Sequence, residues 1–151
     1  MVKKRTPAVE GWFTLDAERP ALLGTRCQAC GTVFFPREET FCRSPLCQGT
    51  EFEEVELSRR GRLWSYTNNA YQPPAPYVSP QDPYQPFAIA AVELERERMV
   101  VLGQVVDGVT VADLEVGMEM ELVLDRLSED AENEYLVYKW RPASFASRRA
   151  Q

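Results

Sequence analysis

Cys27-Gln-Ala-Cys30-Gly31 and Cys42-Arg-Ser-Pro-Leu-Cys47 contain all four cysteines of this 151-residue chain. Two cysteine pairs at this spacing can bring four thiolates around one tetrahedral metal ion. Gly31 supports the turn after the first pair, because glycine adopts positive φ without a steric penalty. Four thiolates close the coordination shell and leave no open position for a substrate. The pattern therefore predicts one structural zinc ion bound by Cys27, Cys30, Cys42 and Cys47.

Three other uses of the cysteines fit the sequence less well. Disulfides are typical of exported chains, but the charged start of residues 1–7 has no apolar run behind it. A redox Cys-x-x-Cys normally opens a helix, whereas residues 32–36 form a short strand pattern that ends at Pro36. Cysteines without a bound metal are the third alternative.

The chain contains no histidine. This absence excludes Ser-His and Cys-His chemistry. The remaining acidic, tyrosine and lysine side chains form no evident constellation, so we expect no catalytic residue in this chain.

Composition and charge limit the class of protein further. Hydrophobic residues make up 44% of the chain, enough for a core of ordinary size, and the net charge is −6. We find no basic face for a phosphate backbone and no run of roughly 20 apolar residues for a membrane span. We expect a cytoplasmic protein that binds neither nucleic acid nor membranes.

The N-terminal helical segment, residues 1–26, is predicted to contain a helix that ends at Pro20 and a short apolar strand over residues 21–26. Thr6 can cap a helix and Pro7 suits its first turn, and apolar residues follow at helical spacing until Pro20. Trp12 and Phe13 lie in this segment. They are interpreted either as core residues or as anchors for a partner.

The remainder is predicted to be β structure, with a zinc ribbon over residues 27–57, an OB-fold barrel over 58–145 and a tail over 146–151. Residues 87–94 and 99–106 flank a charged turn and predict a hairpin. Residues 118–125 and 134–141 predict two further strands, the first with one apolar face and one mostly polar face at period two. The fold class is therefore mainly β, with an N-terminal helix, a four-cysteine ribbon and a C-terminal barrel.

A proline-rich stretch, residues 72–86, separates the first two predicted barrel strands. Such a stretch is stiff and extended. It is either a rigid connector or a docking arm, in which Tyr71, Tyr77 and Tyr84 would contact a partner or ligand. Trp64, on the first barrel strand, is a further candidate for a ligand or interface.

The order of these motifs resembles a known family. Residues 26–31, Cys42, Cys47, residues 61–67, residues 114–120 and residues 140–142 are similar to bacterial zinc-ribbon plus OB-fold proteins that accompany thiolase-superfamily enzymes. The resemblance covers almost the whole chain. The second cysteine pair is longer than the Cys-Pro-x-Cys usual in that family, and Glu95 to Arg98 replace its glycine-bearing turn.

The resemblance implies a non-catalytic subunit that binds a thiolase-like partner of the lipid-transfer-protein type. The complex would act on an acyl-CoA, by retro-aldol cleavage in steroid side-chain degradation or by thiolysis, as an aldolase (lyase) or thiolase complex. We expect a hetero-oligomer, such as a heterotetramer. The alternatives are a single-stranded nucleic-acid-binding module, with stacking by Trp64, Tyr66, Tyr71 and Trp140, and an autonomous acyl-CoA-binding protein.

Overall fold

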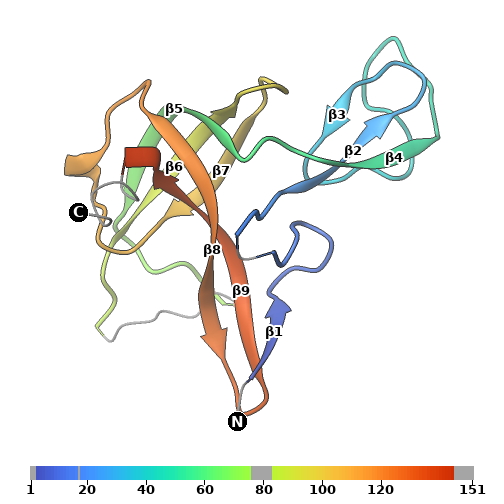
Figure 1. Cartoon of the computed structure of the whole chain (residues 1–151). Helices are drawn as coiled ribbons and strands as arrows, with labels where there is room; N and C mark the ends of the chain where they lie inside the picture. The colour runs from blue at the N-terminus through green and yellow to red at the C-terminus, as the bar shows by residue number, and fades with distance from the viewer. Residues whose placement is uncertain (1–2, 17, 76–82, 145–151) are drawn as a thin grey trace.

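The computed structural model describes residues 3–16, 18–75 and 83–144, which form a β-barrel and a smaller ribbon that projects from it (Figure 1). The barrel strands are β5 (Arg60–Asn69), β6 (Phe87–Leu94), β7 (Val100–Val105), β8 (Glu119–Glu129) and β9 (Asn133–Pro142). The ribbon strands are β2 (Leu23–Cys27), β3 (Val33–Phe34) and β4 (Phe52–Glu56). One turn of 3-10 helix, η1 (Val111–Asp113), lies between β7 and β8.

The barrel has the strand order β9-β7-β6-β5-β8 and closes through pairing of β8 with β9. All of these neighbours are antiparallel except β7 and β9, which are parallel. A five-stranded closed sheet with this crossover is an OB-fold. The predicted hairpin is confirmed, because β6 and β7 pair through register partners such as Ala91 and Leu102.

The barrel core is built around Trp140, whose side chain is fully buried. Leu63, Val92, Leu94 and Met120 are also almost completely buried in the same cluster. Trp140 fits only because the facing residue is Gly103: a Cβ at that position would lie 2.8 Å from Trp140 Cδ1 and 2.9 Å from Tyr138 Cε2. The alternation of each strand thus directs the core side chains inward, while the outward positions carry polar residues and a few exposed apolar ones.

The N-terminal helix prediction is wrong. Residues Lys4–Pro7 form strand β1, which pairs in parallel with β9, and none of residues 8–16 or 18–20 is helical. Gly11 has φ of 81°, which ends any right-handed helix there, and Phe13 forms an isolated antiparallel bridge with Leu22. Trp12 and Phe13 pack from an irregular loop, whereas Val9 is exposed. The strand that pairs with β1 lies at the other end of the chain.

The ribbon and the barrel share one core. Phe13, Leu22 and Leu57 are buried in the cluster that contains the barrel residues. Phe35, just after β3, makes edge-on ring contacts with Trp12 and with Tyr138 of β9, at centroid distances of 5.4 and 6.2 Å. We call this contact the aromatic joint (Trp12, Phe13, Phe35 and Tyr138). It fixes the ribbon against one end of the barrel.

The predicted boundary near residue 58 falls between the end of β4 at Glu56 and the start of β5 at Arg60. The exact division into domains stays a prediction. The tail predicted for residues 146–151 lies outside the described residues.

Candidate metal centre and exposed surfaces

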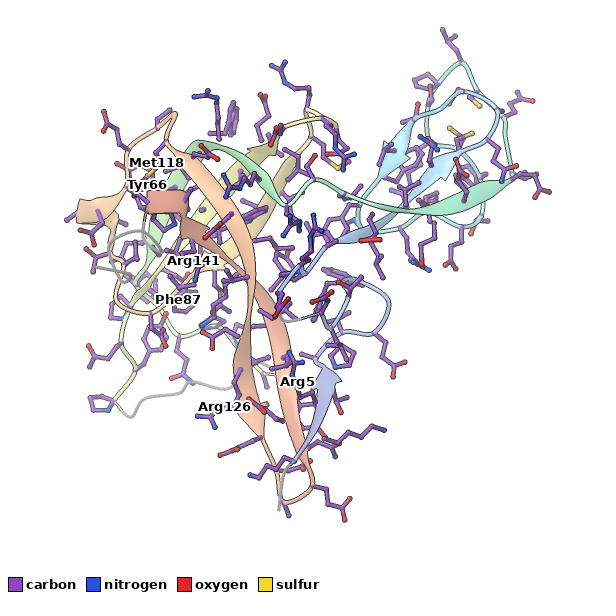
Figure 2. The ribbon with its side chains drawn as sticks, viewed as in Figure 1. Arg5, Tyr66, Phe87, Met118, Arg126 and Arg141 are labelled. Carbon is purple, nitrogen blue, oxygen red and sulfur yellow. The ribbon has the colours of Figure 1, made fainter. Side chains whose placement is uncertain are left out.

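Two turns at the far end of the ribbon position the cysteines. The first turn follows β2, where Gly31 has φ of 81° and its N–H donates to the carbonyl oxygen of Cys27 at 2.8 Å. In the second turn, the N–H of Cys47 donates to the carbonyl oxygen of Ser44 at 3.1 Å. The N–H of Cys42 donates to the carbonyl oxygen of Gly49 at 2.8 Å, which closes that loop. The sulfur atoms therefore gather between the two turns, away from the barrel (Figure 2).

The four sulfur atoms are arranged for one tetrahedral ion. All four Sγ atoms lie within 4.8 Å of one another, with Cys27 and Cys47 at 3.7 Å and Cys30 and Cys42 at 3.6 Å. A zinc–sulfur distance of about 2.3 Å in a tetrahedron requires sulfurs about 3.8 Å apart. These separations are far longer than a disulfide bond of about 2.05 Å, so none of the four cysteines forms a disulfide. The donor set and its dimensions fit zinc.

Gly49 keeps space beside this sulfur cluster. A Cβ at Gly49 would lie 2.8 Å from Cys27 Sγ and 3.4 Å from Cys47 Sγ. The N–H of Gly49 also donates to Cys47 Sγ at 3.4 Å. A hydrogen bond of this kind orients a ligand from outside the coordination shell.

The cysteine pKa values differ with their surroundings. The Thr32 hydroxyl, 3.1 Å from Cys30 Sγ, lowers the pKa of Cys30 to about 6. At Cys42 the backbone N–H of Ser44 acts to lower the pKa, but burial and the neighbouring cysteines outweigh it and raise the pKa to about 12. Because metal ligands must be thiolates, zinc binding displaces protons from this cluster.

The structure places the other predicted site residues in different environments. Phe13 is buried in the core and Trp12 packs on Phe35, so both belong to the aromatic joint. Trp64 and Tyr71 are exposed, by 61% and 86%. The Tyr84 hydroxyl donates to the carbonyl oxygen of Asn69 at 2.8 Å, which ties the end of the proline-rich stretch to β5. Tyr77 lies outside the described residues.

Sequence reasoning missed most of an apolar surface on the barrel. Trp64 lies at a register shift in β5, between Leu63, which pairs with Val92, and Ser65, which pairs with Ala91. Ala91 pairs in turn with Leu102 on the next strand. Leu102 is 62% exposed, and Val100 on the same strand is also exposed. We call this surface the outer face (Trp64, Val100 and Leu102); Ala91, on the strand between them, is only 6% exposed. On β7, the exposed Val100 and Leu102 alternate with buried residues such as Val101 and Val105, and this alternation is the sequence signal that could have revealed the surface.

The ribbon tip carries a second apolar pair that the sequence analysis did not single out. Leu46 is 99% exposed and Phe41 is also exposed, and each directly precedes a cysteine of the second turn. Trp140, considered for base stacking, is fully buried and cannot stack on a ligand.

Two further observations concern the part of the chain that the structure describes. No second group of three or more potential metal ligands occurs among its residues. None of its helices has the length and apolarity needed to cross a membrane.

The fold and the metal centre define a zinc-ribbon plus OB-fold protein. Two family models match it: the rubredoxin-like zinc ribbon domain of ChsH2 over residues 16–53, and the C-terminal OB-fold domain of ChsH2 over residues 54–125. Both matches agree with the sheets described above, and the zinc prediction is confirmed by the ribbon family and by the sulfur geometry.

The relatives below cover between 76% and 91% of this chain. A DUF35 domain-containing scaffold protein of Methanocaldococcus jannaschii is 38% identical over 136 residues, which are 88% of this chain and 87% of that protein. The benzoylsuccinyl-CoA thiolase subunit BbsA of Geobacter metallireducens is 31% identical over 115 residues, 76% of this chain and 70% of that protein. A solved chain of the Ltp2-ChsH2(DUF35) aldolase is 30% identical with a TM-score of 0.60, covering 91% of this chain and 98% of that one. This chain belongs to the ChsH2 and DUF35 scaffold family.

Proposed function

We propose that this protein is an accessory subunit that binds a thiolase-superfamily enzyme in the cytoplasm and supports its action on an acyl-CoA. The observation that carries the proposal is the match of both modules, in the same order, to a thiolase subunit and to a chain of an aldolase complex. The chain has no histidine. Its four cysteines form a closed metal centre. The partner would therefore carry the chemistry.

The outer face is the surface we assign to this partner. Binding energy at protein interfaces is concentrated in a few apolar anchors, among which tryptophan is enriched, surrounded by a polar rim. We take Trp64 and Leu102 as such anchors, because each is more than half exposed and only strand β6 lies between the strands that carry them. The ion pair between Arg98 and Glu93, at 3.0 Å, lies at the rim.

The reaction we propose is cleavage of a carbon–carbon bond in an acyl-CoA, by retro-aldol cleavage or by thiolysis. The names of the aldolase chain and of the thiolase subunit support these two reactions. Steroid side-chain degradation is the pathway we propose for the retro-aldol case. The supporting role of this chain is to hold the partner and to shape its substrate site, in a hetero-oligomer of the heterotetramer type.

Co-expression with a thiolase homologue encoded beside it tests the proposal. The two chains should copurify, and acyl-CoA cleavage by the partner should depend on this chain. Trp64→Ser should weaken the complex by about 2 kcal/mol or more, as measured by calorimetry, because an anchor is lost. Val9→Ser is the matched control, since Val9 is also exposed but lies outside the outer face.

Turnover of an acyl-CoA by the isolated chain, or failure to recover any thiolase homologue, would overturn the proposed function. A complex that forms equally well with Trp64→Ser and with Leu102→Ser would overturn the assignment to the outer face alone. Leu46→Ser would then report whether the ribbon tip is the contact.

A further inference from the structure

The four cysteines of the metal centre differ in their access to solvent. Cys27 and Cys42 are buried, with exposed fractions of 1% and 4%, and Cys47 is half-buried. Cys30 is exposed. A metal ion held between the four sulfurs lies on the inner side of Cys30 and does not cover the side that faces solvent. A reagent that arrives from solvent therefore meets Cys30 first.

Thr32 lies beside the exposed sulfur. Its hydroxyl oxygen is 3.1 Å from Cys30 Sγ, in a contact that is itself exposed. A metal-bound cysteine sulfur is a thiolate and carries no hydrogen, so the hydroxyl must be the donor of this hydrogen bond. A donated hydrogen bond draws electron density from a thiolate and lowers its nucleophilicity. Thr32 therefore moderates the reactivity of the exposed ligand.

Cys42 is the buried cysteine in contact with Cys30. The two Sγ atoms are 3.6 Å apart, and they come from the two different turns of the metal centre. A disulfide of about 2.05 Å would require them to approach by about 1.6 Å. The other two cysteines, Cys27 and Cys47, form a similar pair at 3.7 Å. A bond between Cys30 and Cys42 would thus join the two turns directly.

We infer that Cys30 is the site at which peroxides modify this protein, and that Cys42 completes the reaction. The Cys30 thiolate attacks one oxygen of hydrogen peroxide, the O–O bond breaks, hydroxide leaves, and the sulfur becomes a sulfenic acid. Two electrons pass from the sulfur to the peroxide in this step. The Cys42 thiolate then attacks Cys30 Sγ, the S–O bond breaks, a second hydroxide leaves, and the disulfide forms.

The disulfide removes two of the four metal ligands. Cys27 and Cys47 remain, and two thiolates do not complete the tetrahedral shell of a structural zinc ion. Zinc should therefore leave the ribbon, and the two turns should lose the order that the metal gives them. A thiol reductant reverses a disulfide, so added zinc should then restore the centre. None of these steps requires the proposed partner.

Treatment of the zinc-loaded full-length chain with hydrogen peroxide tests the inference. A chromophoric chelator measures zinc release, and dimedone traps sulfenic acids. Trypsin cleaves after Arg26, Arg37 and Arg43, which places Cys30 and Cys42 on separate peptides, and fragmentation separates Cys30 from Cys27. We expect the first dimedone adduct at Cys30. Without dimedone, a linked pair of peptides 27–37 and 38–43 should appear at the rate of zinc release, and dithiothreitol with zinc should reverse both changes.

Two variants of Thr32 test the moderating hydroxyl. Thr32→Val should release zinc severalfold faster, because the hydrogen bond to the sulfur is lost. Thr32→Ser is the matched control, since it keeps a hydroxyl and should react like the unaltered chain. Equal zinc affinity and equal circular dichroism before peroxide is added establish that the metal centre of each variant is intact.

The mapping of adducts uses the unaltered chain, so it decides the site of modification even where a variant binds zinc poorly. A first adduct at Cys27, Cys42 or Cys47 would overturn the assignment to Cys30. A disulfide that does not include Cys42, or zinc that stays bound after Cys30 is oxidised, would overturn the second step. Equal rates for Thr32→Val and the unaltered chain would refute the role of the hydroxyl.

Discussion

The metal centre should be sensitive to a single methyl group at Gly49. In Gly49→Ala, the new Cβ would lie 2.8 Å from Cys27 Sγ and 3.0 Å from the Ala29 Cβ. Non-bonded heavy atoms pack favourably at about 3.5–4.0 Å, so Cys27 or the 47–50 segment must move by about 0.7 Å. Metal sites tolerate only about 0.2 Å of change in a ligand distance. The substitution should therefore distort the centre while leaving all four ligands in place.

The expected loss is about 10- to 100-fold in zinc affinity, the range found when groups that support ligands are altered. This corresponds to about 1.4–2.7 kcal/mol. Competition with a chromophoric zinc chelator measures the affinity, and the cobalt-substituted protein reports any departure from tetrahedral geometry. Gly108→Ala is the control for backbone strain alone, because its φ of 88° disfavours any side chain while its Cβ would meet nothing within 4 Å; its zinc affinity should be unchanged. A Gly49→Ala affinity within about twofold of the unaltered chain would refute the packing argument.

Four further outcomes are expected. Cys42→Ser should lose zinc and then weaken partner binding, measured by metal analysis and copurification; a variant that kept both would contradict the structural role of the ion. Zinc affinity should fall as pH falls, because protons compete for thiolates such as Cys42, whose pKa is raised to about 12; titration of proton release measures this. Gly103→Ala should lower the free energy of unfolding by about 1–3 kcal/mol in urea, through overpacking against Trp140. Burial raises the pKa of Tyr138 from 10.0 to about 12. The neutral side chain therefore contributes about 2–3 kcal/mol to the free energy of unfolding below pH 10, and this contribution is lost as the pH rises through 12. In Tyr138→Phe, the free energy of unfolding should change less over this pH range.

The ribbon and the barrel strands could be predicted from the sequence because their signals are local. Cysteine spacing alone indicates a metal centre, and period-two alternation marks strands such as β8. The N-terminal segment could not be predicted in this way. Its fold depends on pairing between Lys4–Pro7 and the last strand, and on the backbone of Gly11, neither of which leaves a periodic signal.

The surfaces were harder to predict for a similar reason. Trp64 could be singled out as an aromatic residue on a strand, but Leu102 joins it only through the register of two neighbouring strands.

The aromatic joint has a mechanical consequence. Ring contacts of Phe35 with Trp12 and Tyr138 connect three segments of the chain, so the ribbon tip is held at a set angle to the barrel. The ribbon and the barrel therefore behave as one unit with two projecting surfaces, not as two independently moving domains. An enzyme that contacts both surfaces must be complementary to them at the angle that the aromatic joint sets. Changes in joint packing, such as Phe35→Leu, could then shift which enzymes fit without altering a single contact residue.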